Sequence, residues 1–120
     1  MGVGRVTAPD GVELAVSTTG SANGAVPPMV ATHGWANDRS VWAPIVRELA
    51  GEPAVTTWDL RGHGDSDDVV DPMLLGNDMM ASDALAVLEH LGIDRFAVVG
   101  VSSGGAVGGE MAAVAPDRVT

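Results

Sequence analysis

Ser102 is the side chain in this sequence that is best placed for covalent chemistry. It stands in Gly100-Val-Ser-Ser-Gly104, which matches the pattern G-x-S-x-G and lies between an apolar run and a helical stretch. Glycines on both sides of a serine leave room for a sharp turn that strains the serine backbone and exposes its hydroxyl. A hydroxyl presented in this way can attack a carbonyl carbon once a base removes its proton. The motif by itself is short and also fits a plain turn serine, whereas its place between a strand and a helix favours a serine nucleophile.

Segments on either side of Ser102 predict the strands and helices that would position it. Two β-rich runs, residues 3–8 and 12–19, are separated by the turn signal Pro9-Asp10-Gly11 and predict a hairpin. A loop over residues 20–28 follows, and short apolar runs then alternate with helical patterns. The predicted strands cover residues 29–32, 54–59 and 95–101, and the predicted helices cover residues 40–50, with Ser40 as the N-cap, 78–91 and 104–115.

This alternation of strands and helices predicts the α/β fold class. We expect the antiparallel hairpin to lead into a parallel sheet with helices on both faces and five strands in all. In such sheets, functional groups gather at the carboxyl ends of the strands. Three segments of unusual composition fall at those ends, namely residues 33–35, 59–66 and 100–105.

The composition of the chain excludes several classes of chemistry. Among its 120 residues, 16 are acidic and 6 are basic, so the net charge of −10 argues against nucleic acid as a partner. The basic residues are all arginine, which excludes a Schiff-base lysine, and the absence of cysteine excludes thiolate catalysis and cysteine-bound metals. No apolar stretch reaches the roughly 18 residues that cross a bilayer, and no signal peptide is visible. We therefore expect a soluble, cytoplasmic protein without a membrane partner.

An acidic loop after the fourth predicted strand raises the question of a metal site. Its carboxylates belong to Asp65, Asp67, Asp68 and Asp71. A calcium-binding EF-hand loop that began at Asp65 would need glycine at its sixth position and glutamate at its twelfth. Those positions hold Val70 and Gly76. We therefore predict a solvated acidic loop and no metal.

Three motifs together give the chain a family resemblance over its whole length. They are His33-Gly-Trp35 after the third predicted strand, Asp59-Leu-Arg-Gly-His-Gly-Asp-Ser66 after the fourth, and Gly100-Val-Ser-Ser-Gly-Gly105 after the fifth. In this order and spacing, the chain resembles the N-terminal half of α/β-hydrolase-fold enzymes, in the branch that contains esterases, enol-lactonases, cofactor-free haloperoxidases and iminopeptidases. The resemblance implies that Ser102 is the nucleophile and that the backbone N–H groups of Trp35 and Ser103 hold the oxyanion.

The identity of the residue at position 102 narrows the implied chemistry. A related group, the haloalkane dehalogenases and epoxide hydrolases, has aspartate at the nucleophile position. Ser102 therefore points to acyl transfer through an acyl-enzyme, with a small ester, lactone, thioester or amide as the substrate. The resemblance implies no metal and no organic cofactor.

We interpret the three histidines of the chain as structural residues that support a loop, a turn and a helix end. By the resemblance, His33 helps to order the loop that supplies an oxyanion donor, and His63 belongs to a Gly-His-Gly turn. His90 falls near the end of a predicted helix, where a partly protonated imidazole suits the helix dipole. None of the three is assigned as the catalytic base.

The positions of the acid and the histidine depart from the family pattern. In the family both follow the nucleophile, whereas only Glu110 and Asp117 are acidic after Ser102 and no histidine follows it. The family fold also has more strands than this sequence supplies, and Val119-Thr120 resembles the start of a sixth. We therefore expect residues 1–120 to be the N-terminal part of one catalytic domain, truncated near that strand, with the acid and the histidine missing.

Two other functions stay open at this stage. The chain could be a non-catalytic relative that uses the same pocket to bind a ligand, or an inactive truncated fragment. The DNA downstream of codon 120 separates the enzyme from the inactive fragment. An open frame encoding an aspartate and then a histidine favours the enzyme, and a stop codon favours the inactive fragment. The sequence does not indicate an oligomeric state.

Overall fold

The strands of the protein form one mixed sheet. A computed structural model describes residues 2–21 and 26–120, and the strands within them are β1 (Gly2–Thr7), β2 (Glu13–Thr19), β3 (Met29–Thr32), β4 (Val55–Trp58) and β5 (Ala97–Gly100). Their order is β1-β2-β4-β3-β5. The pairs β1–β2 and β2–β4 are antiparallel, while β4, β3 and β5 run parallel to one another. The predicted hairpin leading into a parallel sheet is therefore confirmed, and part of the predicted loop over residues 20–28 lies outside the described residues.

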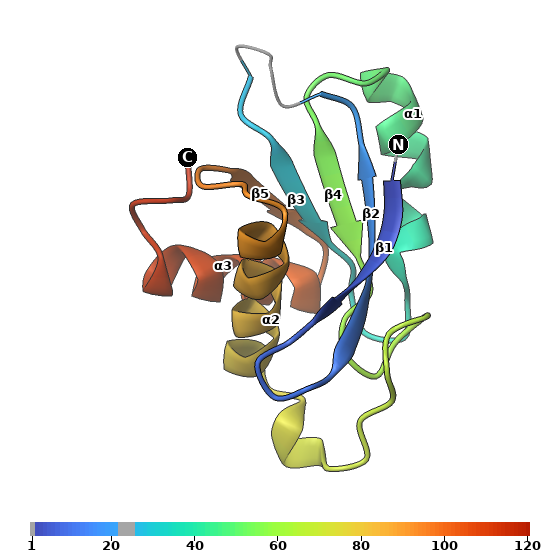
Figure 1. The fold of residues 1–120 in the computed structure, drawn as a ribbon, viewed down its shortest axis with the longest axis vertical. Helices are drawn as coiled ribbons and strands as arrows, with labels where there is room; N and C mark the ends of the chain where they lie inside the picture. The colour runs from blue at the N-terminus through green and yellow to red at the C-terminus, as the bar shows by residue number, and fades with distance from the viewer. Residues whose placement is uncertain (1, 22–25) are drawn as a thin grey trace.

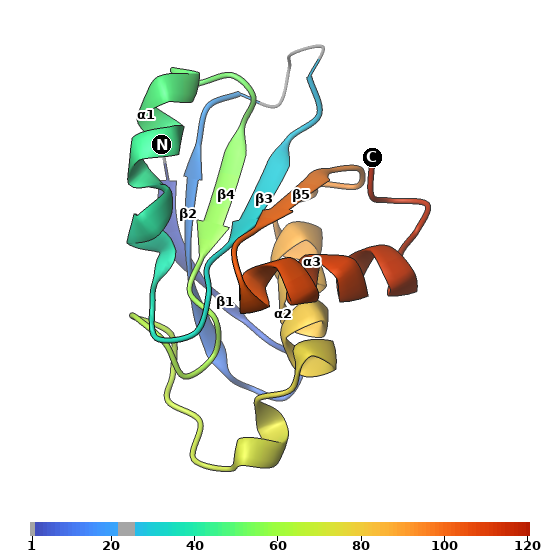
Figure 2. The same ribbon diagram turned by 180° about the vertical axis from the view of Figure 1, so that it is seen from behind.

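Helices cover both faces of the sheet, as the alternating pattern predicts (Figures 1 and 2). They are the 3₁₀ turns η1 (Arg39–Trp42) and η2 (Pro72–Leu74) and the α-helices α1 (Ala43–Leu49), α2 (Asn77–His90) and α3 (Ser103–Val114). Successive residues of β3 show the division, because Val30 packs in a cluster with α2 and α3 and Ala31 packs in a cluster with α1. Of the helices in the described ranges, none has both the length and the apolar character to cross a membrane.

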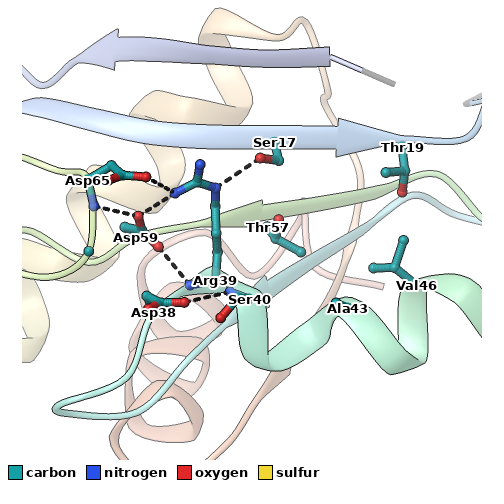
Figure 3. Close-up of a pocket in the computed structure, with 11 residues that line it drawn as sticks. Ser17, Thr19, Asp38, Arg39, Ser40, Ala43, Val46, Thr57, Asp59 and Asp65 are labelled. Atoms are coloured by element: carbon teal, nitrogen blue, oxygen red, sulfur yellow. Dashed lines mark hydrogen bonds and ion pairs between the residues drawn. The ribbon is translucent and has the colours of Figure 1, made fainter.

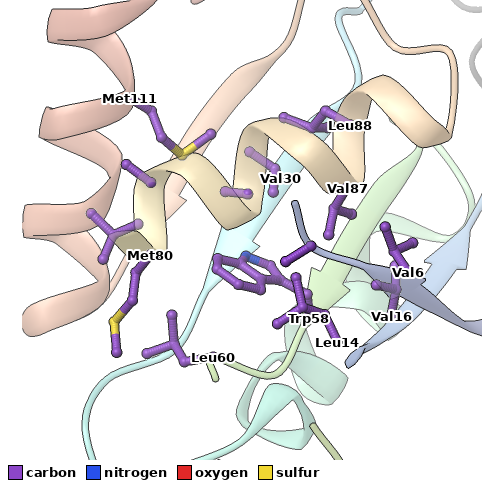
Figure 4. Close-up of a cluster of buried hydrophobic side chains, with 14 of the residues drawn as sticks. Val6, Leu14, Val16, Val30, Trp58, Leu60, Met80, Val87, Leu88 and Met111 are labelled. Carbon is purple, nitrogen blue, oxygen red and sulfur yellow. The ribbon is translucent and has the colours of Figure 1, made fainter. Parts of the chain in front are cut away.

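The larger hydrophobic core lies between the sheet and the helices α2 and α3 (Figure 4). Trp58, at the end of β4, is fully buried there, and its indole N–H donates a hydrogen bond to the hydroxyl of Thr32 across 3.0 Å. The buried face of α2 follows the helical spacing of Met80, Ala84, Val87 and Leu88. This core therefore fixes the ends of the two strands whose following segments carry the first two motifs.

The first helix begins later than the sequence predicts. Ser40 is not its N-cap, because the carboxylate of Asp38 accepts the Ser40 N–H across 2.8 Å and caps the 3₁₀ turn η1. The α-helix α1 begins only at Ala43, next to Pro44, because proline has no N–H to donate and suits the first turn of a helix. The prediction of one α-helix over residues 40–50 is therefore wrong in its first turn.

β5 is an edge strand within the described residues. Beyond it, one parallel bridge joins Phe96 to Val119, and the N–H of Thr120 donates to the carbonyl of Phe96 across 2.9 Å. This pairing fits the expectation that Val119-Thr120 resembles the start of another strand. From Ala97 to Gly100, the outer edge of β5 has no strand partner in residues 2–21 and 26–120.

Candidate active site

Three strand ends lie in register at one edge of the sheet. Thr32 of β3 pairs with Trp58 of β4 on one side and with Gly100 of β5 on the other. Because these strands are parallel, the segments that follow them leave the sheet at the same edge. The motif residues after β3, β4 and β5 therefore meet there, as the sequence predicts.

Ser102 forms a sharp turn between β5 and α3. Its backbone has φ 56° and ψ −122°, a positive-φ conformation that residues other than glycine rarely adopt. The N–H of Gly104 donates to the carbonyl of Val101 across 2.9 Å and closes the turn. Ser102 is exposed, so its side chain is accessible from solvent. The turn has the strand-to-helix context that the G-x-S-x-G pattern requires.

Two glycines of this motif allow the turn to pack against the neighbouring strand. A Cβ atom at Gly104 would overlap the carbonyl oxygens of Thr32 and His33. A Cβ atom at Gly100 would in turn overlap the backbone of Gly104. These neighbours are backbone atoms of a packed sheet and helix, so a side chain at either position would force the backbone apart. Glycine is therefore required at both.

The loop after β3 reaches the Ser102 turn through two close approaches. A Cβ atom at Gly34 would lie 3.3 Å from the Cβ of Ser102, so the two segments are almost in contact. The backbone N–H of Trp35 donates a hydrogen bond to the side-chain oxygen of Ser103 across 2.9 Å. The structure therefore brings together Ser102, Trp35 and Ser103, the three residues that the sequence singles out.

His33 ties the loop after β3 to the loop after β4. Its side chain is fully buried, its Nδ1 lies 2.7 Å from the carbonyl oxygen of Gly34, and its Nε2 accepts the N–H of Leu60 across 3.0 Å. These partners require a neutral ring with its proton on Nδ1, because Nε2 has to offer a lone pair. Burial lowers the pKa of the His33 imidazole, which favours the same neutral form. Both ring nitrogens are therefore used to hold the two loops together.

His63 combines a turn with a ring contact. Its N–H donates to the carbonyl of Leu60 across 2.9 Å, and its carbonyl accepts the N–H of Ser66 across 3.0 Å, which agrees with the turn interpretation. Its ring centroid lies 4.9 Å from that of Trp35 and 5.3 Å from that of His33. The His63 ring therefore supports the indole of Trp35, a contact that the sequence pattern does not indicate.

A buried ion cluster anchors the loop after β4 to α2. The side chain of Arg61 is 1% exposed and donates to Asp83 of α2 across 2.6 and 2.7 Å, and to Asp10 of the hairpin turn across 2.8 and 3.1 Å. Burial raises the pKa of the Asp83 carboxyl, and the Arg61 hydrogen bonds oppose that rise. The hydrogen bond from Arg61 lowers the pKa of Asp10. The sequence contains one signal for this cluster, an aspartate among the apolar positions of α2.

The acidic residues after β4 bind arginine and backbone N–H groups. Asp67 accepts a hydrogen bond from the Arg5 side chain across 3.1 Å and one from the N–H of Glu13 across 3.0 Å. Asp71 caps η2 by accepting the N–H of Met73 across 2.9 Å. These carboxylates therefore stabilise the loop and fasten it to the hairpin.

A pocket of about 480 Å³ lies on the α1 side of the sheet (Figure 3). The fully buried carboxylate of Asp59 accepts the backbone N–H groups of Arg39 and Asp65 across 2.6 and 2.8 Å, and also pairs with the Arg39 guanidinium. The Nε atom of Arg39 donates to the hydroxyl of Ser17 across 2.9 Å. The polar side chains of Asp59, Arg39 and Ser17 are thus paired with one another or with the backbone, and Ser102 does not line the pocket. We therefore regard this pocket as part of the scaffold and not as the reacting site.

Comparison with known proteins supports the resemblance that the motifs indicate. The sequence profile of the alpha/beta hydrolase fold matches residues 27–120. The chain is 34% identical over 100 residues to 3-oxoadipate enol-lactonase 1 of Acinetobacter baylyi, and the aligned region covers 83% of this chain and 36% of that protein. It is 36% identical over 99 residues to fluoroacetate dehalogenase of a Burkholderia species, and the aligned region covers 80% of this chain and 33% of that protein.

A solved structure shares the fold over nearly the whole chain. The thermophilic esterase of Thermogutta terrifontis matches with a TM-score of 0.86 and 30% identity, covering 99% of this chain and 43% of the esterase. The chain therefore spans about a third of the length of the two curated relatives and less than half of the esterase.

Proposed function

Because the chain belongs to the alpha/beta hydrolase family, we propose that it carries the nucleophile and the oxyanion site of a serine hydrolase. The proposed substrate is a small ester, lactone, thioester or amide, and the reaction passes through an acyl-enzyme on Ser102. The observation that carries the proposal is the strained backbone of Ser102 between β5 and α3, with φ 56°. Such strain clusters at reacting groups, where the surrounding structure maintains it.

In the proposed reaction, Oγ of Ser102 attacks the carbonyl carbon of the substrate while a base takes its proton. The carbonyl oxygen becomes an oxyanion that accepts hydrogen bonds from the N–H groups of Trp35 and Ser103. Ser103 is the first residue of α3, so its N–H has no acceptor inside the helix, and the helix N-terminus favours negative charge. The bond to the leaving group then breaks, the leaving group takes up the proton, and water later releases the acyl group.

The serine at position 102 favours acyl chemistry over dehalogenation and epoxide opening. The family resemblance implies an aspartate at this position for the latter two reactions, because a carboxylate attacks the carbon that bears the halogen or the epoxide oxygen. Two of the similar proteins have names that denote lactone and ester substrates, the enol-lactonase of Acinetobacter baylyi and the esterase of Thermogutta terrifontis. Both names are consistent with a serine nucleophile that attacks a carbonyl.

We assign the catalytic base and acid to residues that this sequence does not contain. No histidine follows Ser102, and the ring of His33 is fully used in hydrogen bonds. In the family pattern, both the acid and the histidine follow the nucleophile. Residues 1–120 are in this proposal the N-terminal part of one catalytic domain, in a cytoplasmic protein whose partner is a small acyl substrate.

Reaction with a fluorophosphonate probe tests the proposal. The bond from Oγ of Ser102 to phosphorus forms, the phosphorus–fluorine bond breaks, and the proton passes to imidazole added to the buffer. We expect intact-mass spectrometry to show one adduct and peptide mapping to place it on Ser102. The Ser102→Ala variant should stay unlabelled, while Ser82→Ala, which removes an exposed hydroxyl on α2, should be labelled like the wild type. Equal labelling of the wild type and Ser102→Ala would contradict the proposal.

A further inference from the structure

The side chain of Ser103 lies where the oxyanion of the proposed reaction has to bind. Its oxygen accepts the Trp35 N–H across 2.9 Å. In the proposed mechanism, the same N–H has to donate to the oxyanion. A backbone N–H carries one hydrogen, and oxyanion donors work at about 2.7–3.1 Å. The Ser103 hydroxyl therefore already occupies the direction and the distance that the oxyanion needs.

We propose that the Ser103 hydroxyl is an internal occupant of the oxyanion site, which the substrate carbonyl has to displace; this inference rests on the proposed function. Ser103 then has two opposite effects on one site. Its backbone N–H supplies one of the two donors, and its hydroxyl competes with the substrate for the other donor, the N–H of Trp35. The residue is half-buried, so the displaced hydroxyl can bond to water instead.

A role in capping the helix does not account for this contact. Residue Ser102 takes the N-cap position of α3, and no side-chain cap hydrogen bond is formed there. The Ser103 oxygen instead bonds across the site to Trp35, which belongs to the loop after β3 and lies 68 positions away in sequence. The contact therefore joins the two halves of the oxyanion site to each other.

Displacement of the hydroxyl requires only rotation about one bond. The Cα–Cβ bond of serine has three staggered positions, and a change between them moves Oγ away from the Trp35 nitrogen. A charged oxyanion is a stronger acceptor than a neutral hydroxyl, so it takes over the N–H as the charge develops. The hydrogen bond between the Trp35 N–H and the Ser103 hydroxyl has to break before the transition state is reached, and this loss slows the attack on the carbonyl.

Rates of phosphonylation at Ser102 by the fluorophosphonate test this inference. We expect Ser103→Ala to react about two- to tenfold faster than the wild type, the factor that corresponds to one ordinary hydrogen bond. The decisive comparison is between two variants of the same shape: Ser103→Val lacks the hydroxyl that Ser103→Thr keeps, so Ser103→Val should react faster than Ser103→Thr. Nuclear magnetic resonance gives a second readout, because the Trp35 amide proton should shift in the two variants that lack the hydroxyl and stay in place in Ser103→Thr.

The possible outcomes separate this inference from the proposed function. If Ser102 is labelled and Ser103→Ala reacts at the wild-type rate or more slowly, the inference is wrong and the proposed function stands. If none of the four proteins is labelled, the proposed function fails and the inference fails with it. Alanine is favourable in a helix, so Ser103→Ala keeps α3 intact, and circular dichroism of each variant checks its helix content.

Discussion

The buried Nε2 atom of His33 accepts the backbone N–H of Leu60 across 3.0 Å and so joins the segments that follow β3 and β4. The same ring lies against the carbonyl of Gly34 through Nδ1, at 2.7 Å. Only the neutral imidazole can hold both partners. The position of Trp35, the next residue in the loop, therefore depends on the protonation state of His33.

The free energy of unfolding should decrease when the pH drops below about 6.5, the ordinary pKa of a histidine side chain. Burial lowers the pKa of His33 in the folded state, so the unfolded chain takes up the proton first as the pH falls. The contribution of His33 to the free energy of unfolding is therefore fully present above the pKa of this histidine in the unfolded chain. It is lost as the pH falls through the lower pKa of His33 in the folded state. Thermal unfolding between about pH 5 and pH 8, followed by circular dichroism, measures this.

The His33→Asn variant is the control for the pH effect. It keeps a donor near the Gly34 carbonyl but does not titrate, and it loses the acceptor for Leu60. We expect it to be less stable than the wild type at neutral pH and to lose less stability on acidification. Parallel stability curves for the two proteins would show that His33 does not cause the pH dependence.

The ion cluster of Arg61 should be required for folding stability. Asp83→Ala leaves a guanidinium that is 1% exposed with only Asp10 as its carboxylate partner. Breaking such a buried pair lowers the free energy of unfolding by about 3–5 kcal/mol. Urea unfolding measures the change. Asp78→Ala, which removes an exposed carboxylate from the first turn of the same helix, should have little effect, and equal losses in the two variants would argue against the cluster.

Two glycines of α3 should respond to alanine in opposite directions. At Gly104 the added methyl group would overlap the carbonyls of Thr32 and His33, so Gly104→Ala should destabilise the fold and displace the Ser102 turn. At Gly109 the added group would meet nothing within 4 Å apart from the adjoining backbone of its own helix, so Gly109→Ala should stabilise the helix by about 1 kcal/mol. Melting temperatures of the two variants test the pair. Stabilisation by both would mean that the turn tolerates a side chain.

The outer edge of β5 should make the chain self-associate. The N–H groups of Ala97 and Val101 donate toward β3, so the N–H of Val98 points outward by alternation along the strand. Unpaired groups on an apolar edge strand promote pairing with another copy. The net charge of −10 opposes association at low salt, and salt screens it over about 10 Å at about 0.1 M.

Size-exclusion chromatography with light scattering checks this expectation. We expect association that increases with salt, and a smaller increase for Val98→Pro, which removes an outward N–H without touching a bond to β3. A sharp monomer peak at low and high salt, with a cooperative thermal transition, would contradict this expectation. It would show that residues 1–120 fold as a stable monomer and that the outer edge of β5 does not cause association.

Local sequence patterns account for the turn at Ser102 but not for the contacts around it. Gly100 and Gly104 are close in sequence to the serine that they accommodate, so the pattern contains the reason for the turn. Arg61 and Asp83 are 22 positions apart, and Asp10 is 51 positions from Arg61, so only the completed fold brings their charges together.

The same limit applies to the proposed oxyanion site and to the first helix. A motif assigns the backbone N–H groups of Trp35 and Ser103 but says nothing about the Ser103 hydroxyl, because side-chain contacts across two loops depend on their packing. At the first helix, the apolar spacing continues through residues 40–50, whereas Pro44 and the Asp38 cap set the α-helix boundary.

An acyl adduct on Ser102 is the most direct test of the proposed chemistry. The chain is incubated with p-nitrophenyl acetate in the presence of imidazole as an added base, and is quenched in acid for intact-mass analysis and peptide mapping. We predict one acetyl group on Ser102, transferred with loss of p-nitrophenol, and no such adduct in Ser102→Ala. A wild-type chain without an acetyl adduct, or with the adduct on another residue, would contradict the assignment of Ser102 as the nucleophile.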